Sequence, residues 1–366
     1  MIGEIILVAV LVSASCAIPG VFLVLRKMSL MSDAISHAVL PGIVIGFMLT
    51  QSLSSPLLFI GAVLTGVLTV ILSEALVNTS LVKEDTAIGL VFPALFSIGV
   101  ILVSRYTGNV HMDTDAVLLG ELIFTPLDRI SFRGMDLGPR VAWIMGVVLI
   151  INLLVFLLLF KEMKLATFDA GLAASLGFSP VLLKYILMFD VSITTVGAFD
   201  AVGSILVVAL IITPAATAYL LTDKLHVMVI LSIAVGVVSS LLGFALAWII
   251  DASAAGSMAG MAGFFFLITF LFSPGRGVVS IVRRKKVQKI DFAVTMLTVH
   301  LLHHRDQDCF SVECSEKHLM EHINWDRRFA RQVLQRSTRK GIIESKNGLL
   351  LLTGKGEHMA HEAMAG

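Results

Sequence analysis

Residues 203–222 read GSILVVALIITPAATAYLLT, twenty residues without a charged side chain. A helix of this length spans the hydrocarbon core of a bilayer and satisfies its own backbone polar groups there. Eight similar apolar runs occupy residues 5–25, 28–49, 57–77, 86–104, 141–160, 182–200, 227–250 and 257–273. The stretch 182–222 is nearly continuous, with interruptions at Asp190, Asp200 and Gly203. The sequence therefore predicts eight or nine membrane spans.

The composition supports a membrane protein with a separate basic tail. The chain has 366 residues, of which 57% are hydrophobic and 14% are charged, whereas a soluble domain is about 25% charged. This excludes an ordinary water-soluble enzyme, a disordered chain and a disulfide scaffold. Residues 1–282 hold 12 Lys and Arg against 16 Asp and Glu, while residues 283–366 hold 15 against 10. We predict a transmembrane domain over 1–275, a basic linker over 276–290 and a cytosolic domain over 291–366.

The positions of the basic residues predict which side of the membrane each loop occupies. Short cytoplasmic loops carry an excess of Lys and Arg. Nine alternating spans place most of the basic clusters on that side, with the C-terminus cytoplasmic: Arg26-Lys27, Lys83, Lys161, Lys164, Lys184, Lys224 and Arg283–Lys286. The exceptions are Arg129, Arg133 and Arg140 in the long 105–140 segment, which could contain a re-entrant piece.

An acid and a histidine lie within the second apolar run, in the sequence SDAISHAVLPG over residues 32–42. Asp33 and His37 are four residues apart, so they share one face of a helix. An ionisable group inside a span needs a partner or a function. A carboxylate and an imidazole suit Mn²⁺, Fe²⁺ or Zn²⁺. The alternative is a hydrogen bond that packs helices, because two residues do not complete a metal's coordination sphere.

Other polar residues within the transmembrane domain are weaker candidates. Asp190 and Asp200 either face an aqueous path or mark helix ends. The 105–140 segment contains four possible ligands that could form an outer metal site, although a solvated loop explains them equally: His111, Asp113, Asp115 and Glu121.

A short segment between two spans, FDAGLAASLGFSP over residues 168–180, has the features of a docking helix. Leu172 and Leu176 lie one turn apart, Gly177 ends the helix and Pro180 prevents its continuation. The sequence contains no G-x-x-x-x-G-K-[ST] phosphate-binding loop. We therefore expect a transport subunit rather than an enzyme, and any ATPase must be another chain.

Four ordered segments together resemble the ABC-3 family, the permease subunits of manganese, zinc and iron uptake ABC transporters: Asp33–Gly42, Lys83–Gly89, residues 168–180 and Val202–Ala218. The resemblance implies a bacterial inner-membrane permease that imports Mn²⁺, Zn²⁺ or Fe²⁺ and binds no cofactor of its own. It implies three kinds of partner: cytosolic ATPase subunits, a second permease of the same or a homologous kind, and an extracytoplasmic metal-binding protein.

The same resemblance assigns roles to residues. Asp33 and His37 fall on the family's Asp and His that control the metal pathway. The coupling helix, which the ATPase would hold, comprises Asp169, Gly171, Leu172, Ala173, Leu176 and Gly177. The chain departs from the family in its last outer loop, where Asp251–Gly256 replaces the usual Asp-Leu-Pro-Ser-Gly-Pro.

The tail has the pattern of a small α+β domain. Apolar spacing predicts helices near 292–302 and 315–323 and a third from Asn324 to Gly341. A hairpin with a type I′ turn at Asn347-Gly348 follows. This order is typical of a winged helix-turn-helix. The ending Leu352–Gly356 is similar to the DNA-binding domains of metal-dependent repressors.

Two further functions of the tail follow from its side chains. Arg327, Arg328 and Arg331 could contact nucleic acid phosphates, or else the ATPase or anionic membrane lipid. A metal sensor could be formed by four residues, although surface histidines are the simpler interpretation: Cys309, Cys314, His318 and His322.

Two alternatives to an ABC permease remain open from the sequence. One is a membrane-tethered, metal-responsive transcription regulator whose tail binds DNA. The other is a secondary transporter driven by protons through Asp33, Asp190 and Asp200.

Overall fold

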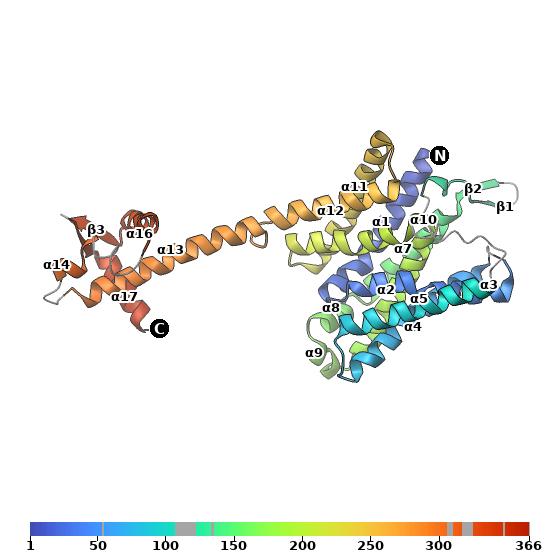
Figure 1. Cartoon of the computed structure of the whole chain (residues 1–366), viewed down its shortest axis with the longest axis horizontal. Helices are drawn as coiled ribbons and strands as arrows, with labels where there is room; N and C mark the ends of the chain where they lie inside the picture. The colour runs from blue at the N-terminus through green and yellow to red at the C-terminus, as the bar shows by residue number, and fades with distance from the viewer. Residues whose placement is uncertain are drawn as a thin grey trace. The chain divides into compact units, whose positions relative to one another are not determined.

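The chain forms two compact units, residues 1–273 and 274–366 (Figure 1). The computed structural model describes residues 1–52, 55–106, 122–132, 135–305, 310–316, 325–346 and 348–365. Nine helical segments within these residues are long and apolar enough to span a membrane. The prediction of a helical body with eight or nine spans is confirmed with nine candidate spans, but the body is not all-α, because it includes a short two-stranded hairpin.

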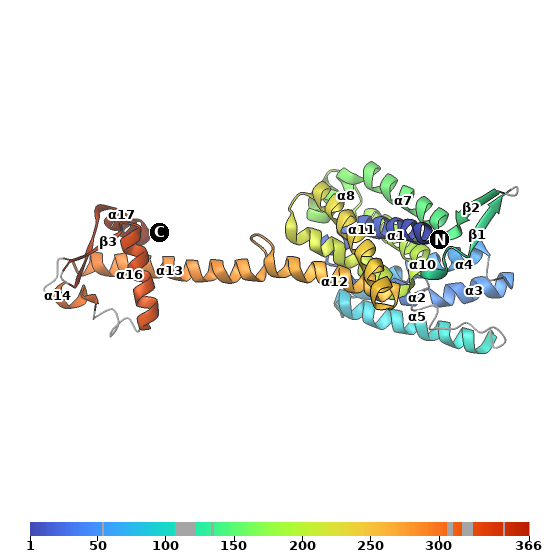
Figure 2. The same ribbon diagram turned by 90° about the horizontal axis from the view of Figure 1, so that it is seen from above.

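The first unit consists of helices joined by short turns, with one small hairpin. Its elements, in chain order, are α1 (Ile2–Leu25), α2 (Leu30–Ala38), α3 (Leu40–Thr50), α4 (Pro56–Asn78), α5 (Glu84–Tyr106), the 3₁₀ turn η1 (Leu122–Phe124), β1 (Arg129–Phe132), β2 (Met135–Pro139), α7 (Arg140–Leu158), α8 (Phe160–Phe168), α9 (Ala170–Ser175), α10 (Pro180–Leu221), α11 (Leu225–Ile250) and α12 (Ala254–Phe272). α1 lies at the centre and packs against α7, α10 and α11 (Figure 2).

Two of the predicted spans depart from straight helices. The second divides at Val39 into α2 and α3, because Pro41 lacks a backbone N–H and occupies the first turn of the new helix. α10 extends over two spans, Pro180–Phe199 and Ala201–Leu221. The break lies at Gly203, whose φ of 75° and ψ of 167° only glycine adopts readily.

Small and polar residues hold the centre of the membrane unit together. The buried Asn152 of α7 donates through Nδ2 to the carbonyl oxygen of Ser15 in α1 and to Thr194 Oγ1 in α10, each at 2.9 Å. Within a bilayer no water is available to these polar groups, so a hydrogen bond between helices satisfies them. One buried amide therefore links three helices.

The contact between α3 and α4 depends on the absence of side chains. A Cβ atom at Gly42 would overlap the carbonyl oxygen of Gly61 and Oγ1 of Thr65. One at Gly46 would lie 2.9 Å from the carbonyl oxygen of Leu57. Gly42 and Gly46 form a G-x-x-x-G pattern, which lets helix backbones approach closely in membranes. This contact fixes α3 immediately after the helix that carries Asp33 and His37.

The second unit has its own hydrophobic core. Its elements are α13 (Val278–His303), α14 (Phe310–Glu313), α16 (Arg327–Arg339), β3 (Ile343–Lys346), β4 (Leu349–Leu352) and α17 (Gly354–Ala365). The strands β3 and β4 pair antiparallel with Ile343 opposite Leu352, as the hairpin pattern predicts. Ser315 adds an isolated bridge to Leu349.

Two parts of this unit differ from the sequence prediction. Residues 278–290, predicted as part of a linker, form the first half of α13, since Lys, Arg, Val and Ile there contain no helix breaker. A further helix, α17, follows the hairpin and packs against α13 and β4. The predicted second helix at 315–323 lies almost entirely outside the described residues.

Candidate functional site

Asp33 and His37 lie on one face of α2, as their spacing predicts. His37 Nε2 is 3.5 Å from Asp33 Oδ1, and the two side chains are 31% and 44% exposed respectively. The imidazole packs beside two aromatic rings of α5, with centroid distances of 6.0 Å to Phe92 and 6.4 Å to Phe96. The aromatic rings orient the imidazole, while the carboxylate stays accessible.

The pair offers an oxygen and a nitrogen ligand on a single helix. Within the described part of the chain, no third His, Cys, Asp or Glu joins them as a ligand group. Ser32 and Ser36, which precede Asp33 and His37 respectively, are buried, and Ser36 Oγ donates to the carbonyl oxygen of Ser32 at 2.9 Å. The geometry therefore offers two possible metal ligands, which alone do not complete a coordination sphere.

Asp190 is placed differently from the accessible pair. It lies within the first span of α10 rather than at a helix end, and it is only 4% exposed. Among the described residues its Oδ1 has no hydrogen-bond partner. The side chain of Asp200 and the four residues of the predicted outer site, His111, Asp113, Asp115 and Glu121, lie outside the described residues.

Arg129, an exception to the predicted charge distribution, is neutralised by carboxylates. Its guanidinium contacts Glu4 at 2.9 Å and Asp136 at 2.7 Å. The Arg129 guanidinium and the backbone N–H of Gly138 hold the pKa of the Asp136 carboxyl below its ordinary value. A paired arginine adds little net positive charge to its loop, so it argues weakly against an outer position.

The predicted coupling segment forms the short helix α9. Asp169 caps it, since Oδ1 accepts from the backbone N–H of Leu172 at 2.8 Å. Gly177, with a φ of 87°, ends it, and the N–H of Phe178 donates to the carbonyl oxygen of Ala173 at 3.0 Å. Gly177 therefore ends the helix as the sequence predicts, and the structure adds Asp169 as the cap at its start.

α9 presents apolar side chains to its surroundings. Leu172 is 47% exposed and Leu176 is 60% exposed, whereas Ala173 between them is fully buried. Phe168 and Phe178 at the two ends are also exposed. A six-residue helix anchored by a buried alanine and carrying exposed leucines is suited to binding another protein.

The arrangement of these spans and segments is one that known proteins share. The sequence model of the ABC 3 transport family matches residues 1–273. This chain belongs to that family. As an ABC 3 protein it is a multi-pass membrane component of a transport system rather than an enzyme. The short coupling segment and the Asp-His span both fall within the matched residues.

Individual relatives support the assignment. The chain is 53% identical over 360 residues to the zinc transport system membrane protein TroD of Treponema pallidum, covering 98% of each chain. It is 45% identical to the manganese transport system membrane protein MntD of Bacillus subtilis, over 75% of this chain and 93% of the relative. Among solved structures, a chain of PsaBC from Streptococcus pneumoniae in complex with Fab matches with a TM-score of 0.63 and 33% identity, covering 75% of this chain and 92% of that chain.

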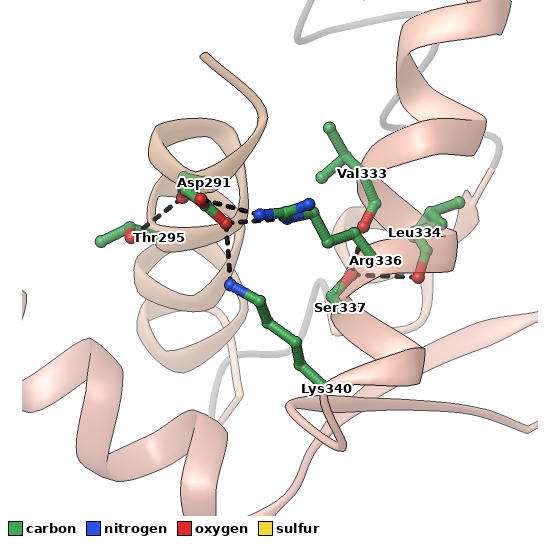
Figure 3. Close-up of polar contacts among 7 residues, drawn as sticks. All are labelled: Asp291, Thr295, Val333, Leu334, Arg336, Ser337 and Lys340. Atoms are coloured by element: carbon green, nitrogen blue, oxygen red, sulfur yellow. Dashed lines mark hydrogen bonds and ion pairs between the residues drawn. The ribbon is translucent and has the colours of Figure 1, made fainter. Parts of the chain in front are cut away.

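The tail of this ABC 3 protein is shared with the Treponema relative, since that alignment covers almost the whole chain. Its predicted nucleic-acid residues Arg327, Arg328 and Arg331 are exposed on α16. Two other basic residues of the same helix region are used internally. Arg336 forms two hydrogen bonds with Asp291 of α13, at 2.8 and 2.9 Å, and Lys340 adds a third at 2.8 Å (Figure 3).

The charges of Arg336 and Lys340 therefore hold α16 against α13 instead of facing a partner. The guanidinium of Arg336 and the ammonium of Lys340 keep the pKa of Asp291 below its ordinary value. The sequence pattern alone does not separate these residues from the exposed arginines, because the acid they contact lies far away in the chain.

Of the predicted tail sensor, Cys314 is fully buried in the hydrophobic core of the second unit. Cys309, His318 and His322 lie outside the described residues. The structure instead brings together His300, His304 and Glu313. The spacing of the two histidines, one helical turn, is a signal that the sequence contained and that the prediction missed.

Proposed function

We propose that this chain is the membrane-spanning permease subunit of a bacterial ABC importer for a divalent transition metal ion, Mn²⁺, Zn²⁺ or Fe²⁺. The observation that carries the proposal is the accessible Asp33–His37 pair within a span of an ABC 3 protein. The names of its relatives as zinc and manganese transport proteins agree with the ligand chemistry of that pair.

The exposure of the pair supports a path rather than a structural contact. A charged side chain facing lipid costs a few kcal/mol. Asp33 and His37 are 44% and 31% exposed in the single chain, so their face must meet water or protein instead of lipid. We therefore place there the pathway between this subunit and a second permease, either another copy or a homologue.

The proposed site binds its cation weakly enough for release. Two protein ligands leave other coordination positions to water, which exchanges readily. In an alternating-access cycle the pair would bind the ion more tightly in the outward-facing state than in the inward-facing state, because only a difference in affinity converts ATP-driven motion into net import. Asp33 and His37 supply the oxygen and nitrogen ligands in both states.

The ATPase would be a separate cytosolic subunit that holds α9. The sequence contains no phosphate-binding loop, and the exposed Leu172 and Leu176 provide an apolar surface for such a subunit. In this proposal the α9 side of the membrane unit, the Lys-rich loops and the C-terminus face the cytoplasm of an inner-membrane protein. An extracytoplasmic metal-binding protein would deliver the ion from the opposite side.

The function is tested by uptake of labelled Mn²⁺, Zn²⁺ and Fe²⁺ into cells that carry Asp33→Ala or His37→Ala. We expect uptake to fall at least tenfold while the protein remains in the membrane. Asp251→Asn and His226→Ala, which change an acid and an exposed histidine at span ends, serve as matched controls. Normal uptake by both pathway variants would refute the assignment, and loss of uptake on collapsing the proton gradient with ATP intact would favour the secondary transporter.

For the second unit, we infer a winged-helix-like module. α13, α14 and α16 precede the antiparallel hairpin of β3 and β4, which is the order that such a module requires. Binding of nucleic acid through Arg327, Arg328 and Arg331 stays a prediction of the sequence. The test is promoter occupancy in cells that carry the chain truncated before α13. If the second unit binds DNA, promoter occupancy is lost on this deletion. If the chain acts only in transport, promoter occupancy does not change.

A further inference from the structure

Three side chains of residue types that bind metal ions lie close together in the second unit. His300 and His304 lie one turn apart at the C-terminal end of α13, and Glu313 ends α14. One ring nitrogen from each histidine and one carboxylate oxygen of Glu313 all lie within 4.8 Å of one another. All three residues are half-buried, so the ligands are partly desolvated and remain reachable by an ion from solvent.

The hydrogen bonding of His300 is the kind found at metal sites. Its Nε2 lies 3.2 Å from the backbone carbonyl oxygen of Glu313. A carbonyl oxygen only accepts, so Nε2 must carry the hydrogen, and the neutral ring then keeps a lone pair on Nδ1. Histidines that bind metals usually donate their other ring N–H to a carbonyl or carboxylate in this way. The contact therefore fixes both the tautomer and the orientation of the ring.

The segment that carries Glu313 is connected to the hairpin. The backbone N–H of Leu350 donates to the carbonyl oxygen of Cys314 at 2.9 Å, and the N–H of Glu316 donates to that of Gly348 at 3.1 Å. An ion bound to both histidines and to Glu313 would consequently join the end of α13 to the residues that pair with β4. Binding of an ion to these three ligands would thus also restrain the hairpin.

We propose that His300, His304 and Glu313 form a second, regulatory binding site for a divalent transition metal ion, separate from the transport pathway. Two imidazoles and one carboxylate suit Zn²⁺, Mn²⁺ and Fe²⁺. Three protein ligands leave at least one position for water, so the ion can exchange with the cytosolic pool. The site thus senses the concentration of the ion and orders α14 and the hairpin when it is filled.

The structural alternative is that the histidines only stabilise the helix end. A histidine near the C-terminus of a helix interacts favourably with the helix dipole, and such a role requires neither Glu313 nor a metal. The two explanations differ in their response to Glu313→Gln, because this change removes a ligand charge without altering the helix end.

The test uses the full-length protein in detergent micelles, carrying Asp33→Ala and His37→Ala so that the transport pair is absent. Bound Zn²⁺ and Mn²⁺ per chain are measured by elemental analysis after equilibrium dialysis, and Co²⁺ serves as a spectroscopic probe of histidine ligation. We expect one equivalent of metal in this background. Adding Glu313→Gln or His304→Ala should weaken binding by about 100-fold or more, since even the loss of a group that only hydrogen-bonds to a metal ligand costs about 10–100-fold.

Matched controls are His358→Ala and His361→Ala, which remove histidines of α17 that belong to the same unit. Hydrogen exchange provides an independent readout: Zn²⁺ should slow amide exchange in residues 310–316 and in the hairpin of the background protein, and not in the Glu313→Gln variant. Unchanged binding and protection in Glu313→Gln and His304→Ala would overturn the proposal. Because the pathway pair is absent throughout, this result is independent of the outcome of the uptake experiment.

Discussion

The exposed face of α9 makes the docking of the ATPase open to a quantitative test. The perturbation is the double substitution Leu172→Ala and Leu176→Ala. It leaves the Asp169 cap and the Gly177 turn in place, and alanine has a higher helix propensity than leucine. The helix should therefore form as before, with only its apolar surface reduced.

The magnitude follows from how much of each side chain remains to be buried. Full burial of a leucine contributes about 1.5–3 kcal/mol. Leu172 and Leu176 are 47% and 60% exposed in the isolated chain, so about half of that contribution, roughly 1 kcal/mol each, is available to a partner. The double variant should lose about 2 kcal/mol, which corresponds to a roughly 30-fold weaker affinity.

The assay titrates the purified ATPase subunit over the detergent-solubilised permease immobilised on a surface and measures the affinity. Metal uptake in cells is measured alongside it. Leu127→Ala is the matched control, because Leu127 is 66% exposed in the 105–140 segment, which is predicted on the other side of the membrane. We expect the control to bind normally. An affinity of the double variant within twofold of the unmodified protein would refute the assignment of α9 as the docking helix.

The architecture of the membrane unit could be predicted because bilayer thickness dictates span length. All nine runs identified by composition correspond to helical spans. The sequence did not predict the division of the second span, although Pro41 marks it, because proline also occurs within intact helices such as α1 at Pro19. The geometry of the break at Gly203 depends on φ and ψ, which no composition rule supplies.

The proximity of candidate residues could be predicted where they are neighbours on one helix and not where they come from different segments. Asp33 and His37 needed only the i,i+4 rule. The contact of Asp291 with Arg336 and Lys340 joins residues 45 and 49 positions apart, so the sequence pattern alone does not show that these two cations are paired. Glu313 was missed because it lies on α14 and not on the helix that carries His300, which is 13 residues earlier in the chain.

Two further predictions concern stability. Gly42→Ala should destabilise the membrane unit by about 1–3 kcal/mol, because the new methyl group overpacks the α3–α4 contact. Gly263→Ala is the control, since nothing lies within 4 Å of the added carbon, and it should be neutral or stabilising by up to about 1 kcal/mol. Thermal unfolding in detergent measures both variants, and equal effects would contradict the packing argument. The second concerns Asp291, whose pKa in the folded unit is lowered by Arg336 and Lys340. A carboxyl with a lowered folded pKa contributes stability that is present above its unfolded pKa, about 3.9, and is lost as the pH falls through the folded value. Asp291→Asn removes the ionisable group at every pH. The difference in amide protection of α16 between the unmodified protein and this variant should therefore be constant from pH 7 to about pH 5 and should shrink below about pH 4. A difference that persists unchanged into more acidic solution would show that the ion pairs do not hold α16 against α13.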